Sequence, residues 1–355
     1  MLPAPRSGTA PFALSVLDNV SNGVGETVAE AYGSTIELAR TADSHGYHRF
    51  WMSEHHAMPG ASTPAPQMMV ARLVGETTNI RLGAGGIMLP NHSPLVIAEQ
   101  FGMLEAMAPG RIDLGLGRAP GTDSATASAL RRQLDANEHF PQQIAELTGF
   151  LNDDFPESHP YRNIHAVPGR WQARENRVDP SSLGPEIWIL GSSPYSAQIA
   201  GHLGRPYAFA LQFGDADVHT AMKIYRDSFR PSEFLDEPYS MVSASVLAHD
   251  DPAEALQQAS TSAMAMLRMF QRKSFTLFTP EEVAEYPATL QERQIIDTYV
   301  NRTITGDGAQ VAQQLEQLHE LTGVDEMMMV LLGHSPSTVQ RTVEIVAGHY
   351  GMKKN

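Results

Sequence analysis

Short runs of apolar residues alternate along the chain with longer segments that carry one apolar face. The runs are rich in β-branched and aliphatic residues and are bounded by Gly or Pro, as in Arg81-Leu-Gly-Ala-Gly-Gly-Ile-Met-Leu-Pro90. This pattern predicts strands that are covered on both faces, as in a parallel sheet. The predicted strands span 12–18, 48–55, 81–90, 111–118, 186–191, 206–212, 239–248 and 327–332.

The longer segments predict helices. In the first of them Ile36, Leu38 and Ala42 share one face, and Gly46 is a typical helix stop. The predicted helices span 27–46, 66–77, 93–107, 124–151, 195–203, 217–229, 252–270, 307–321 and 338–347.

Strand and helix alternate about eight times, which predicts a parallel (β/α)8 TIM barrel, with a doubly wound open sheet as the alternative. Irregular insertions are expected at 152–185, after the fourth helix, and at 271–293, before the last βα units. Because the alternation resumes after each insertion, we expect a single domain over 1–355.

The 355 residues carry 25 Lys and Arg against 40 Asp and Glu, a formal net charge of −15. This balance argues against binding to nucleic acid or to an anionic membrane surface, both of which attract basic patches. The absence of cysteine excludes disulfides, zinc–thiolate sites, iron–sulfur clusters and thiol nucleophiles. We find neither a signal-peptide pattern nor an apolar stretch near the roughly 20 residues that span a bilayer, so we expect a cytoplasmic protein.

In a (β/α)8 barrel the chemistry lies at the carboxyl ends of the strands. Paired glycines weaken a strand, because they lose more backbone entropy and have no side chain to pack. Their usual compensation is the close approach of something flat or bulky, and for Gly85-Gly86 we expect a flavin ring. The strand ends that carry candidate residues are Glu54-His55-His56, Gly85-Gly86, Gly117-Arg118 and Gly191-Ser192-Ser193.

The last of these strand ends predicts a phosphate site. Small hydroxyl residues before a helix offer free backbone N–H groups, hydroxyl donors and the positive end of the helix dipole. Ser196 lies one turn further on, and an arginine at the same rim, Arg118, suits a phosphate dianion. The alternatives are plain N-capping by the serines and an ion pair of Arg118 with Asp113 or Asp123.

The two adjacent histidines suggest a metal site at first, but adjacent residues at a strand end point to opposite sides. We therefore expect no metal, and a barrel metallohydrolase remains a distant alternative that stoichiometric zinc would reveal. One histidine at the rim is expected to donate or accept a proton, because imidazole changes charge near neutral pH. The other is expected to be a hydrogen-bonded structural or interface residue.

Five motifs in order resemble those of the bacterial luciferase-like flavin-dependent monooxygenases, and together they extend over nearly the whole chain. They are Trp51-Met-Ser-Glu-His-His56, the stretch 81–90, Pro94-Leu-Val-Ile-Ala-Glu-Gln100, Gly110-Arg-Ile-Asp-Leu-Gly-Leu-Gly-Arg118 and Ile187-Trp-Ile-Leu-Gly-Ser-Ser193. The resemblance implies a (β/α)8 barrel that binds FMN, receives it reduced from a separate NAD(P)H:flavin reductase, and activates O2.

The resemblance also assigns roles to residues. It implies a non-prolyl cis peptide bond at Gly85-Gly86 and phosphate contacts from Arg118, Ser193 and Ser196, with Ser192 at a position that can be acidic in the family. It makes His55 the active-site histidine, and it places His56 at a homodimer interface opposite Glu99 of the partner. The reactive cysteine of luciferases corresponds to Gly117, which puts light emission in doubt, and 271–293 corresponds to a mobile lid.

The implied reaction passes through a C4a-(hydro)peroxyflavin, with His55 as acid or base during oxygen transfer to a small organic substrate. An F420-dependent hydride-transfer enzyme on the same barrel and a non-catalytic flavin-binding protein are the alternatives. Sequence does not identify the substrate. A hydrophobic or aromatic compound is suggested only by Phe275, Leu277 and Phe278.

Overall fold

The computed structural model describes residues 3–179, 184–213 and 217–353. Eight parallel strands close into a barrel in the order β6-β5-β4-β3-β2-β1-β9-β7, and the β6–β7 pairing completes the ring. The predicted (β/α)8 barrel is therefore confirmed, and the open doubly wound sheet is excluded. The strands are β1 Ala13–Asp18, β2 Arg49–Met52, β3 Arg81–Met88, β4 Ile112–Gly117, β5 Glu186–Gly191, β6 Tyr207–Ala210, β7 Ser240–Ala248, β8 Ile304–Gly306 and β9 Glu326–Leu331.

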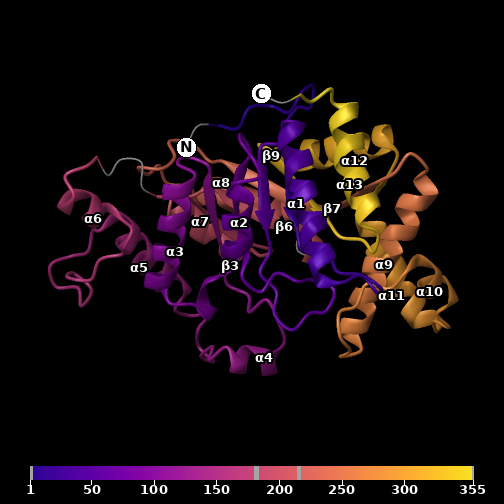
Figure 1. Cartoon of the computed structure of the whole chain (residues 1–355), viewed down its shortest axis with the longest axis horizontal. Coiled ribbons are helices and arrows are strands. Elements are labelled where there is room, and N and C mark those ends of the chain that lie inside the picture. The colour runs from indigo at the N-terminus through magenta and orange to yellow at the C-terminus, as the bar shows by residue number, and fades with distance from the viewer. Residues whose placement is uncertain (1–2, 180–183, 214–216, 354–355) are drawn as a thin grey trace.

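Helices surround the barrel, with α9, α10 and α11 together on one side and α5 and α6 on the opposite side (Figure 1). The α-helices are α1 Val28–Ser44, α2 Pro66–Val74, α3 Pro94–Met107, α4 Ser124–Ala129, α5 Phe140–Asn152, α6 Arg170–Glu175, α7 Pro194–His202, α8 Val218–Ser228, α9 Pro252–Phe270, α10 Pro280–Glu285, α11 Leu290–Arg302, α12 Gly308–Thr322 and α13 Pro336–His349. Two 3₁₀ turns, η1 Leu89–Asn91 and η2 Leu211–Phe213, follow β3 and β6.

Three local expectations were wrong in part. The single helix predicted over 124–151 is two helices, α4 and α5, separated by a segment in which Arg131 has a positive φ of 59°. The segment 271–293 is not irregular, because it contains α10 and the start of α11. Each of these helices begins with a capping box, Thr279 with Glu282 and Thr289 with Glu292, a Thr-x-x-Glu signal that is visible in the sequence. The short strand β8, which pairs with the end of β7, was not predicted.

The amino end of the barrel is filled by buried charges. Arg49, at the start of β2, lies 2.8 Å from Asp113, 3.0 Å from Glu186 and 3.1 Å from Glu326, and these carboxylates come from β4, β5 and β9. The indole N–H of Trp51 also donates to Asp113, at 2.9 Å. Because side chains occupy this end, the carboxyl ends of the strands are where the barrel can admit a ligand.

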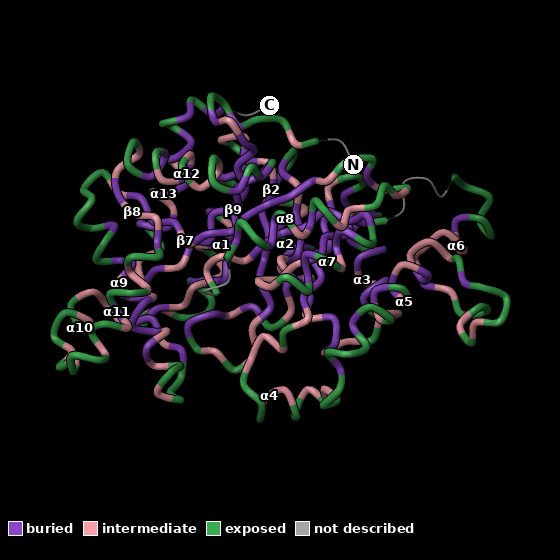
Figure 2. Tube along the Cα trace, turned by 180° about the vertical axis from the view of Figure 1, so that it is seen from behind, coloured by how far each residue is buried: buried purple, intermediate pink, exposed green. Residues whose placement is uncertain are grey.

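The distribution of buried and exposed residues matches the barrel arrangement. The strands form the buried centre of the molecule, whereas α4 and α10 are largely exposed at its periphery (Figure 2). None of the helices in the described ranges is both long and apolar enough to cross a membrane.

Candidate active site

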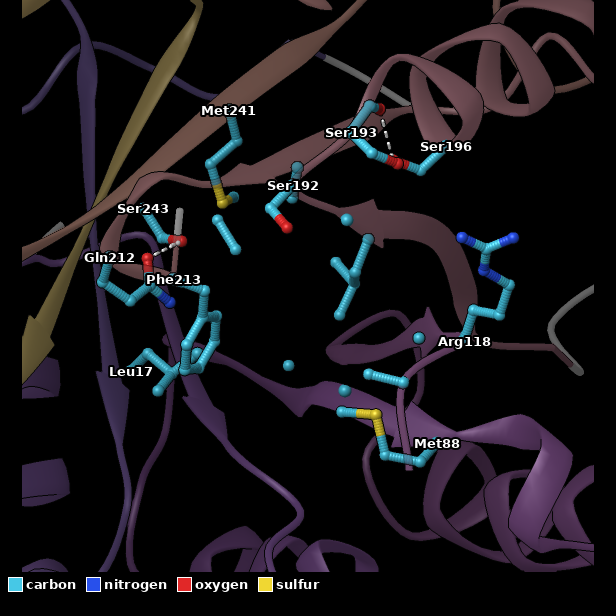
Figure 3. A pocket seen from close by; sticks show the side chains of 18 of the residues that line it. Leu17, Met88, Arg118, Ser192, Ser193, Ser196, Gln212, Phe213, Met241 and Ser243 are labelled. Carbon is cyan, nitrogen blue, oxygen red and sulfur yellow. Dashed lines mark hydrogen bonds between the residues drawn. The ribbon is translucent and has the colours of Figure 1, made fainter. Parts of the chain in front are cut away.

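A pocket opens at the carboxyl ends of the strands, and each cofactor-binding residue expected from the sequence lines it. Its walls are mostly apolar side chains and bare backbone. Arg118, Ser193 and Ser196 lie at one end, whereas Leu17, Phe213 and the hydrogen-bonded pair Gln212 and Ser243 lie at the other end (Figure 3). The lining residues include Leu17, Trp51, Gly85, Gly86, Met88, Gly117, Arg118, Leu190, Gly191, Ser192, Ser193, Ser196, Gln212, Phe213, Met241 and Met328.

The backbone at Gly85-Gly86 forms part of the pocket wall, and the peptide bond between these residues is cis, as the family resemblance implied. The reason for the glycines is partly different from the one expected. A Cβ on Gly85 would lie 2.5 Å from Trp51 Cε3, and a Cβ on Gly86 would lie 2.6 Å from the carbonyl oxygen of Gly115. The packing of the barrel itself therefore requires both glycines, whatever the pocket binds.

The polar end of the pocket is built on the start of α7. Ser193 occupies the N-cap position, yet its side chain makes no capping hydrogen bond, so plain N-capping does not account for it. The guanidinium of Arg118 lies 4.3 Å from the ring centre of Tyr195, in the first turn of the same helix. Helix N–H groups beside a cation form a suitable site for an anion such as phosphate.

Neither expected ion pair of Arg118 is observed. Asp113 lies near the start of β4 and pairs with Arg49 and Arg81, whereas Arg118 follows the end of that strand. Asp123 caps α4 through the backbone N–H of Thr126, at 2.9 Å. The guanidinium therefore remains available at the pocket rim.

Ser196 differs from the other serines of this site. It is buried, and its hydroxyl donates to the carbonyl oxygen of Ser193 at 2.9 Å and lies 3.2 Å from the Tyr207 hydroxyl. Its hydroxyl proton is thus committed inside the protein. Ser192 and Ser193 are the serines whose hydroxyls are left for a ligand.

His55 faces a second cavity that shares Gln212 and Phe213 with the first pocket. We call this second cavity the His55 chamber. Burial lowers the pKa of His55 to about 4, and the smaller opposing effect of Glu54 does not cancel it, so the ring is neutral at pH 7. The chamber is lined by Asn19, His55, Met58, Ala61, Gln212, Phe213, Ser245, Ser262, Ala263, Met266, Met269, Phe275, Tyr299, Arg302, Thr303, Val330 and Leu332.

Glu54 has a role that the sequence did not reveal. Its buried carboxylate accepts hydrogen bonds from His56 at 3.0 Å, from His92 at 2.9 Å and from the backbone N–H of Met88 at 2.9 Å. Burial opposes its charge, but these hydrogen bonds outweigh burial and lower the pKa of Glu54 to about 2. Glu54 thereby ties the end of β2 to the end of β3, next to the cis peptide bond.

The two neighbouring histidines are separated as predicted. His55 opens on the chamber, whereas His56 contacts Glu54 of its own chain. No group of three or more potential metal ligands occurs in the described ranges 3–179, 184–213 and 217–353.

The three hydrophobic residues expected to contact a substrate lie in different places in the fold. Phe275 lines the chamber, but Leu277 is fully buried beside Gly23. Phe278 packs among α9, α10 and α11, beneath the guanidinium of Arg268. Gln212, Phe213 and Leu17 belong to the pocket but were not predicted. Strand periodicity does not tell which residues follow the bend out of β6, and it does not tell that Leu17 of β1 lines a pocket rather than the core.

Comparison with known proteins identifies relatives that share this sequence pattern and this fold. The sequence model described as luciferase-like monooxygenase matches residues 11–326. An Escherichia coli protein named luciferase-like monooxygenase is 37% identical over 319 residues, which cover 90% of this chain and 91% of the relative. An N-acetyl-S-alkylcysteine monooxygenase of Bacillus subtilis is 33% identical over 307 residues, covering 86% and 88%. The crystal structure of apo-MsnO8 superimposes with a TM-score of 0.84 at 30% identity, covering 97% and 99%.

More distant relatives differ in chemistry. The oxygenase component of a flavin-dependent trigonelline monooxygenase from Acinetobacter baylyi is 25% identical over 255 residues, covering 68% of this chain and 65% of the relative. An F420-dependent secondary alcohol dehydrogenase shares the fold, with a TM-score of 0.65 at 13% identity, covering 94% and 99%. The fold alone therefore does not choose between FMN and F420.

Proposed function

The chain belongs to the luciferase-like monooxygenase family, and from this premise we propose that it is the oxygenase of a two-component system that uses reduced FMN and O2 on a small organic substrate. A separate cytoplasmic NAD(P)H:flavin reductase supplies the reduced FMN. The observation that carries the proposal is that the Arg118–α7 pocket and the His55 chamber are neighbouring cavities, which share Gln212 and Phe213 as lining residues.

The residues of the pocket fit FMN. The phosphate is held by Arg118, by the hydroxyls of Ser192 and Ser193, and by the backbone N–H groups at the start of α7. Ser196 contributes its main chain, because its hydroxyl is engaged internally. The apolar wall that includes the Gly85-Gly86 backbone would hold the isoalloxazine, which when reduced would supply the electrons that activate O2.

The chamber is where the substrate binds. Its walls are mainly methionine, alanine, aliphatic and aromatic side chains, which exclude water and favour an apolar group. His55 presents an imidazole to that group as acid or base. The B. subtilis relative named for N-acetyl-S-alkylcysteine makes thioethers the first compounds to test.

The decisive experiment measures incorporation of ¹⁸O from ¹⁸O2 into product. The protein is incubated with FMN, NADH and an unrelated flavin reductase, and a panel of thioethers, aldehydes and aromatic compounds is analysed by mass spectrometry. A His55→Gln variant is expected to bind FMN normally and to lose at least about 100-fold in oxygenation rate. The exposed His219→Gln serves as the matched control. Unchanged oxygenation in His55→Gln would remove His55 from the reaction. A wild type that binds FMN but gives no ¹⁸O-labelled product with any compound of the panel would instead support a flavin-binding protein without catalysis.

The F420 alternative predicts a different cofactor preference. Apoprotein is titrated with FMN and with F420 under the same conditions, and cofactor extracted from the purified protein is identified by its absorption spectrum. Tighter binding of F420, with hydride transfer in the absence of O2, would replace the oxygenase proposal.

We also propose a homodimer formed through α2 and α3. Met68, Val96, Met103 and Met107 are exposed apolar residues of these helices, and Glu99 belongs to the same surface region. His56 lies nearby and contacts Glu54 in its own chain, so it would reach a partner only with its free edge. Light scattering of wild type and of Met103→Glu tests the dimer, and an unchanged mass in the variant would contradict it.

A further inference from the structure

A line of hydroxyl groups connects His55 to a backbone carbonyl behind the chamber. His55 Nδ1 lies 3.0 Å from Ser53 Oγ, and Ser53 Oγ lies 3.2 Å from Thr63 Oγ1. Thr63 in turn donates to the carbonyl oxygen of Asn19, at 3.3 Å. Both hydroxyl residues are buried, with exposed fractions of 4% for Ser53 and 1% for Thr63.

The carbonyl oxygen fixes the direction of this line, because a carbonyl can only accept a hydrogen bond. The single hydroxyl proton of Thr63 is committed to Asn19, so Thr63 must accept from Ser53. The single proton of Ser53 is then used as well, and Ser53 must accept from His55. Proton counting therefore leaves Nδ1 of His55 as a donor.

We propose that Ser53 and Thr63 are positioning residues that hold His55 in the tautomer with its proton on Nδ1, so that Nε2 presents a lone pair to the chamber. The ring enters the reaction as a proton acceptor. When a bound O–H or N–H group gives its proton to Nε2, the imidazolium that forms keeps its Nδ1 proton on Ser53, and a later step returns the Nε2 proton. The inference rests on the proposed role of His55 as acid or base, and it specifies that His55 first accepts a proton.

Two other observations agree with this assignment. A tautomer is defined only for a neutral ring, and burial keeps the pKa of His55 near 4 despite the neighbouring charge of Glu54. The backbone N–H of His55 also donates to the carbonyl oxygen of Thr63, at 3.1 Å. Thr63 therefore bonds to the main chain of His55 as well as to Ser53, which fixes the relative positions of His55, Ser53 and Thr63.

The test reads the tautomer directly and needs neither flavin nor substrate. Wild-type protein labelled with ¹⁵N-histidine is examined at pH 7.5 by long-range ¹H–¹⁵N correlation, and the His55 ring is assigned by its loss in His55→Gln. We expect the Nδ1–H pattern in wild type. We expect a shift toward Nε2–H in Ser53→Ala, with Nδ1–H retained in Ser53→Thr and in the matched control Ser62→Ala.

An Nε2–H ring in wild type would overturn the inference, even if Ser53→Ala did not fold. An Nδ1–H ring that is unchanged in Ser53→Ala would overturn the role of the hydroxyl line. The ¹⁸O experiment fails or succeeds independently of these spectra, so a wrong function and a wrong tautomer are distinguishable. If both hold, Ser53→Ala lowers kcat by about tenfold or more while FMN affinity stays unchanged.

Discussion

Replacing Arg118 by methionine tests whether the polar end of the pocket holds a phosphate. Methionine keeps most of the length of the arginine stem, but it removes the charge, the hydrogen-bond donors and the cation–π contact with Tyr195. The uncapped start of α7 remains in place, as do Ser192 and Ser193. The change therefore isolates the guanidinium from the rest of the site.

The magnitude follows from the contacts available to Arg118. A hydrogen bond to a charged group contributes about 1.5–3 kcal/mol, which corresponds to about a 10- to 150-fold increase in Kd for FMN. The helix start contributes a further 0.3–1 kcal/mol or so, and this share survives the substitution. Riboflavin carries no phosphate, so its affinity is expected to change by less than about twofold.

Fluorescence titration measures both ligands in wild type, in Arg118→Met and in the exposed control Arg131→Gln. The diagnostic quantity is the loss of affinity for FMN relative to the loss for riboflavin, because a change in the apolar part of the pocket affects both ligands equally. Equal losses for the two ligands would show that Arg118 shapes the pocket without contacting phosphate. Unchanged FMN affinity would refute the phosphate site itself.

Three further predictions concern the barrel. Asp113→Asn removes a carboxylate that Arg49, Arg81 and Trp51 share, while Glu186 and Glu326 still face Arg49, so the free energy of unfolding in urea should fall by about 1.5–3 kcal/mol. Gly86→Ala places a methyl group 2.6 Å from the Gly115 carbonyl oxygen, and the same assay should show a loss of about 1–3 kcal/mol or more. Burial raises the pKa of Glu105 from its ordinary value of 4.5 to about 7, so its contribution to stability is complete below pH 4.5 and is lost as the pH rises from there through about 7, because the unfolded chain ionises first. Glu105→Gln, which cannot ionise, should therefore stabilise the protein by about 2–3 kcal/mol at pH 8 and by much less at pH 5.

The substitutions of Asp113 and Gly86 each have a matched control, and Glu105→Gln is compared at two pH values. Asp236 is exposed, so Asp236→Asn should change stability by less than about 0.5 kcal/mol. Nothing lies within 4 Å of a Cβ built on Gly33 in α1, so Gly33→Ala should stabilise by about 0.5–1 kcal/mol. A loss in Asp113→Asn no larger than that of its control would show that the buried ion cluster is not needed. A gain in Glu105→Gln that is the same at pH 5 and pH 8 would contradict the raised pKa.

The sequence by itself determined the barrel and much of the pocket. The run 186–191 was predicted with its observed bounds, because an apolar run between breakers is a local property of the chain. Gly85-Gly86 and Gly191-Ser192-Ser193 were located for the same reason, since a parallel barrel brings every strand end to one rim. The capping boxes of α10 and α11 were equally local, and attention to Thr-x-x-Glu would have predicted both helices.

What the tertiary structure alone decided is which distant side chains meet. Arg49 and Asp113 are 64 positions apart, and no periodicity indicates that their side chains pair inside the barrel rather than face solvent. The same is true of Glu54, which reaches the end of β3, and of Phe275, which enters the chamber while Phe278 does not. The pattern of apolar residues specifies how each segment folds, because it reflects local backbone geometry and one buried face. Hydrogen bonds and ion pairs between segments depend on the closure and register of the barrel, and they exist only once the strands are placed side by side.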